Sequence, residues 1–150
     1  MAHTFTNLMY HTVFSTKRRR PLLEAEVMPR VIEYVGGILR NRGATLLAMG
    51  GVPDHVHLLT VLPAAQALST VMRDIKSASS GWIRQTFPPL STFAWQGGYA
   101  AFTVSKSSAP EVTSYIERQE KHHHETSFEE EFVAFLDRHN IDYDPKFVFD

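Results

Sequence analysis

The hydrophobic positions divide the chain into strand-like and helix-like segments. Four segments rich in β-branched and aromatic residues are expected to be strands: residues 4–15, 44–49, 55–62 and 99–105. Four others carry apolar residues at helical spacing and are expected to be helices: residues 23–42, 66–87, 109–123 and 128–138. Gly43 ends the first helix and Pro88-Pro89 ends the second, while the spacing of a capping box opens each of the last two.

The order of these segments is β-α-β-β-α-β followed by further helices, which is typical of the split βαβ arrangement. We therefore predict an α+β fold with a ferredoxin-like antiparallel sheet, helices on one face and extra C-terminal helices. No repeat or linker divides the sequence, so residues 1–150 are expected to form one domain. The fold class alone does not define a function.

Composition narrows the class of protein. The chain is 43% hydrophobic and 21% charged, as in ordinary globular proteins, and its lack of cysteine excludes disulfides and thiolate sites. No apolar run approaches the ~20 residues of a membrane span, and the first residues do not have the layout of a signal peptide, so we expect a cytoplasmic protein. The formal net charge is −1, so a nucleic-acid partner has to be held by local patches such as Lys17–Arg20, which otherwise reads as a solvated turn.

Two histidines interrupt the apolar run GVPDHVHLLTVL at residues 51–62. On a strand His55 and His57 project from the same face, roughly 6.6 Å apart at Cα, so both imidazoles can converge on one cation. Zinc or manganese suits such a pair, and oxygen donors alongside favour manganese or magnesium. For Asp54 the sequence leaves three roles open: a metal ligand, a hydrogen-bond acceptor for one imidazole, or a turn residue. Two buried structural histidines are the alternative to a metal site.

A second pair lies on the helix expected at residues 109–123. Tyr115 and Gln119 are four residues apart and share one helical face. The pair is either a tyrosine packed on the sheet beside an exposed glutamine, or a phenol nucleophile beside an amide oxygen that completes a metal site. The histidines that follow, His122 to His124, are interpreted as a polar helix end.

Four stretches together resemble the single-tyrosine HUH transposases of the insertion-sequence-200 class, the IS200-like transposases. They are PDHVHLL, WQGGYAAFTVS, the Tyr115–Gln119 pair with the histidines after it, and SFEEEFVAFLDRHNIDYD. The resemblance implies that His55 and His57 are metal ligands, that Gln119 is the third protein ligand and that Tyr115 attacks a DNA phosphate. It also implies Mg²⁺ or Mn²⁺ as the cofactor, and a link between Tyr115 and the 5′ phosphate.

The resemblance further implies the partners. Single-stranded DNA with hairpin ends is the expected substrate, and a homodimer is expected in which His55 and His57 of one chain meet Tyr115 and Gln119 of the other. The candidate phosphate contacts are the basic residues Lys17, Arg18, Arg19, Arg20, Arg73, Lys76 and Lys106. The candidates for stacking on bases are Trp95, Tyr99 and Phe102, each of which also suits the core.

The sequence thus predicts a metal-dependent transposase that cleaves and rejoins single-stranded DNA at insertion-sequence ends through a 5′-phosphotyrosine, in the cytoplasm at the nucleoid. Three alternatives stay open. One is a domesticated relative that processes hairpin repeats. Another is a non-catalytic nucleic-acid-binding module, for which the ferredoxin-like sheet is a common platform. The third is a metal-dependent hydrolase in which Tyr115 is structural.

Overall fold

The computed structural model describes residues 2–119 and 126–149. Its strands are β1 (Leu8–Ser15), β2 (Thr45–Val52), β3 (His55–Leu62) and β4 (Ala100–Val104). Its helices are α1 (Met28–Asn41), α2 (Leu68–Thr86), α3 (Ala109–Glu117) and α5 (Phe128–Arg138), and short 3₁₀ turns are η1 (Lys17–Arg19), η2 (Pro88–Leu90) and η3 (Lys106–Ser108). None of the helices in this described part is both long and apolar enough to span a bilayer.

The four strands form one antiparallel sheet in the order β2-β3-β1-β4. This order follows from two crossovers, because α1 carries the chain from β1 past the position of β3 to β2, and α2 carries it from β3 past β1 to β4. The predicted ferredoxin-like α+β fold is therefore confirmed. The crossovers also make β1 and β3 the two central strands, and β3 carries both histidines.

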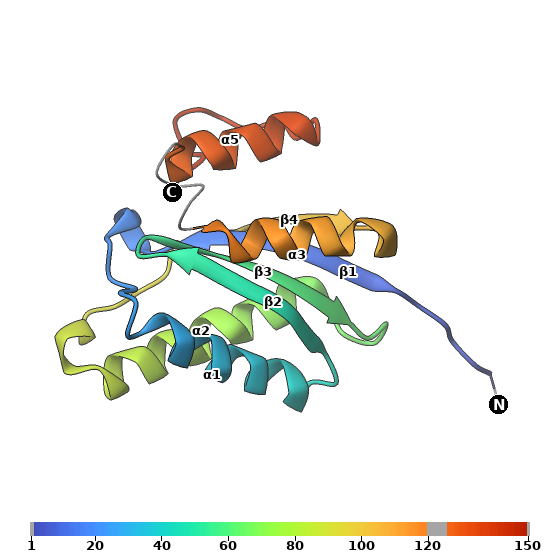
Figure 1. The fold of residues 1–150 in the computed structure, drawn as a ribbon, viewed down its shortest axis with the longest axis horizontal. Helices are drawn as coiled ribbons and strands as arrows, with labels where there is room; N and C mark the ends of the chain where they lie inside the picture. The colour runs from blue at the N-terminus through green and yellow to red at the C-terminus, as the bar shows by residue number, and fades with distance from the viewer. Residues whose placement is uncertain (1, 120–125, 150) are drawn as a thin grey trace.

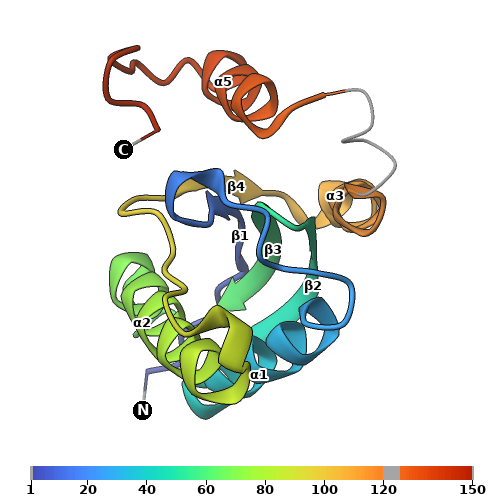
Figure 2. The ribbon, with the colours of Figure 1, turned by 90° about the vertical axis from the view of Figure 1, so that its left-hand side faces the viewer.

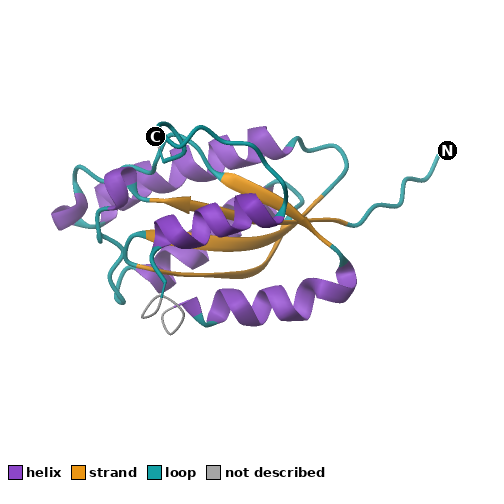
Figure 3. Ribbon diagram, turned by 90° about the horizontal axis from the view of Figure 1, so that it is seen from above, coloured by secondary structure: helices purple, strands orange, loops and turns teal. Residues whose placement is uncertain are grey.

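Helices cover both faces of the sheet (Figure 1). On one face α1 and α2 pack against residues such as Phe14, Val56 and Leu58. Helices α5 and α3 lie over the other face (Figures 2 and 3). There α5 packs its phenylalanines against Val13 and Phe102, and α3 packs separately on β2. Burial on both faces explains why β3 reads as an almost continuous apolar run and shows no alternation.

Among the predicted segments that the structure describes in full, three boundaries were wrong by three or more residues. The first strand begins at Leu8, not at residue 4, because Leu8 pairs with Leu62 at the end of β3 and residues 4–7 have no neighbour to pair with; Phe5 is 91% exposed. Helix α1 begins at Met28 because residues 25–27 first form a turn, although Leu23 is buried. Strand β2 continues to Val52, since Gly50 and Gly51 stay paired with β3.

The other predicted elements agree closely with the structure. Strand β4 and helix α2 differ by one or two residues at their ends, and α5 has the predicted bounds. Helix α3 ends at Glu117, earlier than predicted, and the last part of the predicted segment, residues 120–123, lies outside the described residues.

Candidate active site

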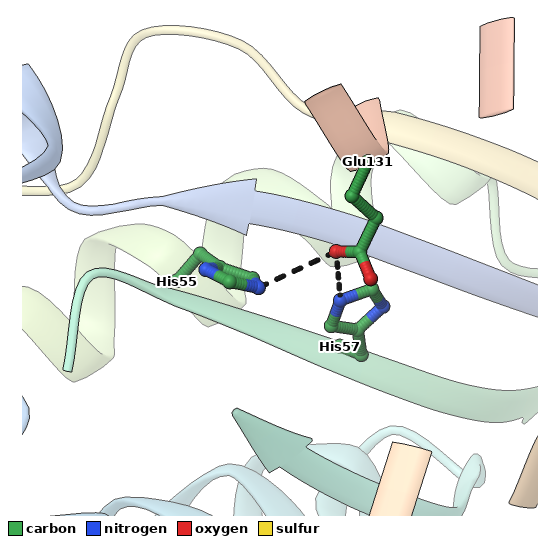
Figure 4. A group of neighbouring side chains, drawn as sticks. All are labelled: His55, His57 and Glu131. Carbon is green, nitrogen blue, oxygen red and sulfur yellow. Dashed lines mark hydrogen bonds and ion pairs between the residues drawn. The ribbon is translucent and has the colours of Figure 1, made fainter. Parts of the chain in front are cut away.

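Strand β3 presents His55 and His57 to the face that α3 and α5 cover. Both side chains are fully buried. Their Nε2 atoms face one carboxylate oxygen of Glu131, a residue of α5 (Figure 4). This oxygen, Oε1, lies 3.4 Å from His55 Nε2 and 2.8 Å from His57 Nε2. The ligand atoms of the three residues all lie within 4.8 Å of one another. Two strand residues and one helix residue thus converge on one buried point.

Neighbouring side chains fix the orientation of both imidazoles. The Asp54 carboxylate accepts a hydrogen bond from His55 Nδ1 at 2.7 Å, and His11 Nε2 lies 2.8 Å from His57 Nδ1. Each ring therefore has its Nδ1 engaged and its Nε2 directed at the shared point, as metal-binding histidines commonly do. Of the roles considered for Asp54, the structure supports two: it lies in the turn between β2 and β3, and it is the acceptor for His55.

The electrostatics of these histidines follow from burial and from their partners. Burial lowers the pKa of His55, but the hydrogen bonds to Asp54 and Glu131 outweigh it, so the pKa of His55 is raised. For His11, burial and the neighbouring His57 lower the pKa to about 3, so His11 stays neutral. The two carboxylates thus favour the charged form of His55, whereas burial disfavours the charged form of His11.

Tyr115 reaches the same carboxylate from α3. Its hydroxyl donates a hydrogen bond to Glu131 Oε2, the oxygen that the histidines do not share, and the edge of its ring faces His57 with centroids 5.7 Å apart. Burial and the Glu131 carboxylate raise the pKa of Tyr115 above its usual range, while a hydrogen bond from Gln119 partly opposes them. The phenol is therefore held protonated beside a carboxylate that can accept its proton.

Gln119 lies next to Tyr115 and is 1% exposed. Its Nε2 donates to the backbone oxygen of Tyr115 at 3.2 Å, but its Oε1 has no hydrogen-bond partner among the described residues. A buried amide oxygen without a partner is costly and calls for an explanation such as a cation. Two imidazole nitrogens, a carboxylate and this oxygen make a donor set that fits a divalent cation.

Two residues of the site were missed in the sequence. Glu131 belongs to an acidic run that reads as a solvated face, yet it shares the apolar face of α5 with Phe128 and Phe135, three and four residues away. A glutamate at a position of the helix that the apolar spacing predicts to be buried was the signal that could have identified Glu131 as a site residue. His11 becomes visible only when strand pairing is known, because β1 places it two residues from Val13, the partner of His57.

The predicted DNA contacts fall into three places. Lys17 to Arg20 form η1 and its end, directly after β1, and Thr16 there donates its N–H to the Asp54 carbonyl at 2.9 Å. Arg73 and Lys76 lie on α2, and Lys106 is exposed in η3. Trp95 and Phe102 are only 7% and 5% exposed, so both are core residues, whereas Tyr99 is half-buried.

Comparison with known proteins defines the class of this chain. Residues 4–119 match the family described as "Transposase IS200 like", and the chain belongs to this family. It is 30% identical over 117 residues to the ISDra2 transposase TnpA of Deinococcus radiodurans, covering 75% of this chain and 84% of that protein. It is 31% identical over 128 residues to the transposase for insertion sequence element IS200 of Salmonella typhimurium, covering 79% of this chain and 81% of that protein.

Solved structures share the fold. A chain from Deinococcus radiodurans described as a candidate transposase has a TM-score of 0.66 and 27% identity, over 79% of this chain and 95% of that one. A REP-associated tyrosine transposase, solved with a REP hairpin bound, has a TM-score of 0.58 and 16% identity, over 79% of this chain and 70% of that one.

Proposed function

We propose that the protein is a single-tyrosine HUH transposase that cleaves and rejoins single-stranded DNA at insertion-sequence ends through a 5′-phosphotyrosine. One observation carries the proposal: the Tyr115 hydroxyl binds the same buried carboxylate that faces both Nε2 atoms of His55 and His57. A nucleophile and a candidate cation site thus share one point. The activity belongs to the cytoplasm, at the nucleoid, where the DNA substrate lies.

Tyrosine suits a reaction that must be reversed. Attack by the Tyr115 oxygen forms a bond to phosphorus and breaks the bond to the 3′ oxygen, which leaves and takes a proton from solvent. Glu131 Oε2 already accepts the phenolic hydrogen bond and can take the phenolic proton. The ester keeps the energy of the phosphodiester, so a free 3′-hydroxyl can later displace Tyr115 and rejoin a strand.

The phenol alone is a weak nucleophile. With an ordinary pKa near ~10, about one phenol in a thousand is ionised at pH 7, a deficit of roughly 4 kcal/mol. His55, His57, Glu131 and Gln119 would hold Mg²⁺ or Mn²⁺. When bound, such a cation supplies positive charge against the phosphate oxygens, where negative charge develops in the transfer. The neutral imidazoles would not reduce the charge of the cation, whereas the Glu131 carboxylate would cancel part of it.

Basic residues close to the site are the candidates for binding the phosphates of the DNA. Lys17 and Arg18 of η1 are exposed, as is Arg20 directly after it, and the turn adjoins Asp54 through the backbone of Thr16. We propose that η1 binds phosphates close to the cleaved bond, and that hairpin ends supply the single strand.

We also propose a homodimer with shared active sites, in which His55 and His57 of one protomer meet Tyr115 and Gln119 of its partner. The resemblance to the family supports this arrangement, and so does the small, polar connector Ser105 to Ala109, at whose last residue α3 begins. Helix α3 contacts the sheet through a local patch in which Ile116 packs on Ala48 and Leu59. A partner's α3 would make the same contacts. In the described chain α3 lies on its own sheet, so a site completed within one chain is the alternative.

The first prediction concerns the nucleophile. Labelled single strands from the DNA flanking the gene, incubated with the protein and Mn²⁺, should give an adduct that survives denaturing electrophoresis. Tyr115→Phe should abolish the adduct while leaving DNA binding nearly intact, because the change removes one oxygen. The same loss is expected when excess chelator is added.

Three results would count against the proposal. An adduct with Tyr115→Phe means that another residue is the nucleophile. Cleavage without an adduct indicates a hydrolase, and binding without cleavage indicates a non-catalytic nucleic-acid-binding module.

A further inference from the structure

A second pocket lies away from the histidines, between α2 and the segment that leads from η2 to β4. Figure 2 shows this segment running along the edge of the sheet from the α2 layer up to β4. The pocket has a volume of about 410 Å³, which falls within the ~300–1,000 Å³ typical of small-molecule sites. Its lining includes Ser69, Arg73, Lys76, Ser80, Gln96 and Tyr99.

The lining has the composition of an anion site beside an aromatic surface. It contains two cations and three serine hydroxyls, and none of its residues is acidic. Asp74, which neighbours Arg73 on α2, pairs with Arg42 and lines a different pocket, although Arg73 Nε also lies 3.4 Å from its carboxylate. The guanidinium of Arg73 is largely exposed, so it is available to a phosphate.

The floor of the pocket is prearranged. Lys76 Nζ donates to the carbonyl of Gly98 at 2.8 Å and lies 5.5 Å from the ring centre of Phe14 and 5.8 Å from that of Tyr99. Burial lowers the pKa of Lys76. Trp95 is fixed beneath by its indole N–H, which donates to Ser79 Oγ at 2.9 Å. Tyr99 is only half-buried, so its ring is the aromatic surface that a ligand can still reach.

Backbone and side-chain hydrogen bonds connect this pocket to the strand that pairs with His55. The side chain of Gln96 accepts a hydrogen bond from Ser15 N–H at 2.6 Å, and Gln96 N–H donates to Ser15 O at 2.9 Å. Ser15 is in turn the strand partner of His55. The end of β1 therefore lies between the pocket, which adjoins α2, and the histidines, which face α3 and α5.

We propose that this pocket binds one unpaired nucleotide of the DNA strand being processed, with its phosphate on Arg73 and Lys76 and its base against Tyr99. The inference rests on the proposed function only in taking single-stranded DNA as the ligand. The exposed hydroxyls of Ser69 and Ser77 and the half-buried one of Ser80 are the groups that can contact the sugar or the edge of the base. An isolated phosphate would use the cations but leave the aromatic wall empty.

The test measures DNA affinity in the Tyr115→Phe background, where no cleavage interferes. The probe is a fluorescein-labelled 30-mer single strand from the DNA flanking the gene, followed by fluorescence anisotropy at several salt concentrations. Arg73→Ala should weaken binding and reduce the salt slope by about one. Tyr99→Ala should weaken binding by about 5- to 150-fold, as expected for loss of one stacked base. The matched control Arg40→Ala removes an exposed arginine from α1 and should leave affinity unchanged.

An abasic scan of the same 30-mer identifies the base. One abasic position should reproduce the loss caused by Tyr99→Ala, and on that probe Tyr99→Ala should cause no further loss. Gly97→Leu provides an independent variant, because Gly97 lines the pocket and a Cβ there meets nothing within 4 Å. We expect the added side chain to narrow the pocket. It should weaken binding of the unmodified probe more than that of the abasic one.

Unchanged affinity in Arg73→Ala and Tyr99→Ala would overturn the inference, as would equal losses on every abasic probe. Either result leaves the proposed function intact if wild-type protein still forms the Tyr115 adduct. Conversely, binding through the pocket without an adduct would refute the proposed function alone.

Discussion

Glu131 shows at the scale of single residues what the sequence can and cannot provide. The spacing of His55 and His57 predicts their common face, because strand geometry is local, and the i,i+4 spacing of Tyr115 and Gln119 does the same on a helix. Glu131 lies 74 residues from His57 along the chain, so no local period connects the two. The structure adds it as an oxygen donor beside the histidines, where the sequence had offered Gln119 and, as one of three roles, Asp54.

The second prediction separates these two candidate ligands. Mn²⁺ binding is measured by calorimetry on the protein without DNA. His57→Ala should abolish binding, and Glu131→Gln should weaken it at least about tenfold, since the isosteric change removes the only charged donor of the group. Glu130→Gln is the matched control, because Glu130 is exposed on the same helix. If Glu131→Gln binds Mn²⁺ as tightly as the control does, Glu131 is not a ligand and Gln119 is the better candidate.

At the scale of elements, the sequence predicts the order and type of each segment better than its ends. Each strand and helix carries its own apolar pattern, whereas a strand ends where its neighbour ends. Residues 4–7 look like strand but lie beyond Leu62, the last residue of β3, and so stay unpaired. The distance between α3 and β2 likewise depends on a contact between the two elements. A Cβ at Gly50 would come within 2.5 Å of the backbone oxygen of Ile116, so α3 can lie this close only because residue 50 has no side chain.

The third prediction uses that approach. Gly50→Ala should push α3 away from β2 and carry Tyr115, the residue before Ile116, out of position. Adduct formation should slow at least about tenfold, and thermal unfolding should show a loss of roughly 1–3 kcal/mol from overpacking. In the control Gly37→Ala the new Cβ has only the flexible side chain of Arg40 nearby, at 3.7 Å. That variant should keep full activity and be slightly stabilised, because alanine favours helix. An unchanged rate of adduct formation in Gly50→Ala would show that α3 need not dock this closely.

At the scale of the whole molecule, the open question is which chain supplies α3. The fourth prediction mixes inactive Tyr115→Phe protein with inactive His57→Ala protein and allows their subunits to exchange. In a heterodimer with shared sites, one site carries both defects and the other carries neither, so adduct formation should return. Sites completed within one chain would each keep one defect. A mixture that stays inactive, with exchange confirmed by differently tagged protomers, would rule out the shared arrangement.

The central claim is that Tyr115 becomes covalently linked to DNA, and peptide mapping tests it most directly. The wild-type adduct is digested with nuclease and then with trypsin, and the peptides are analysed by mass spectrometry. Cleavage after Lys106 and Arg118 releases residues 107–118, a peptide whose only tyrosine is Tyr115. We predict that this peptide carries the nucleotide remnant, with fragmentation placing it on Tyr115. A remnant on any other residue, or cleaved DNA with no modified peptide, would contradict the account.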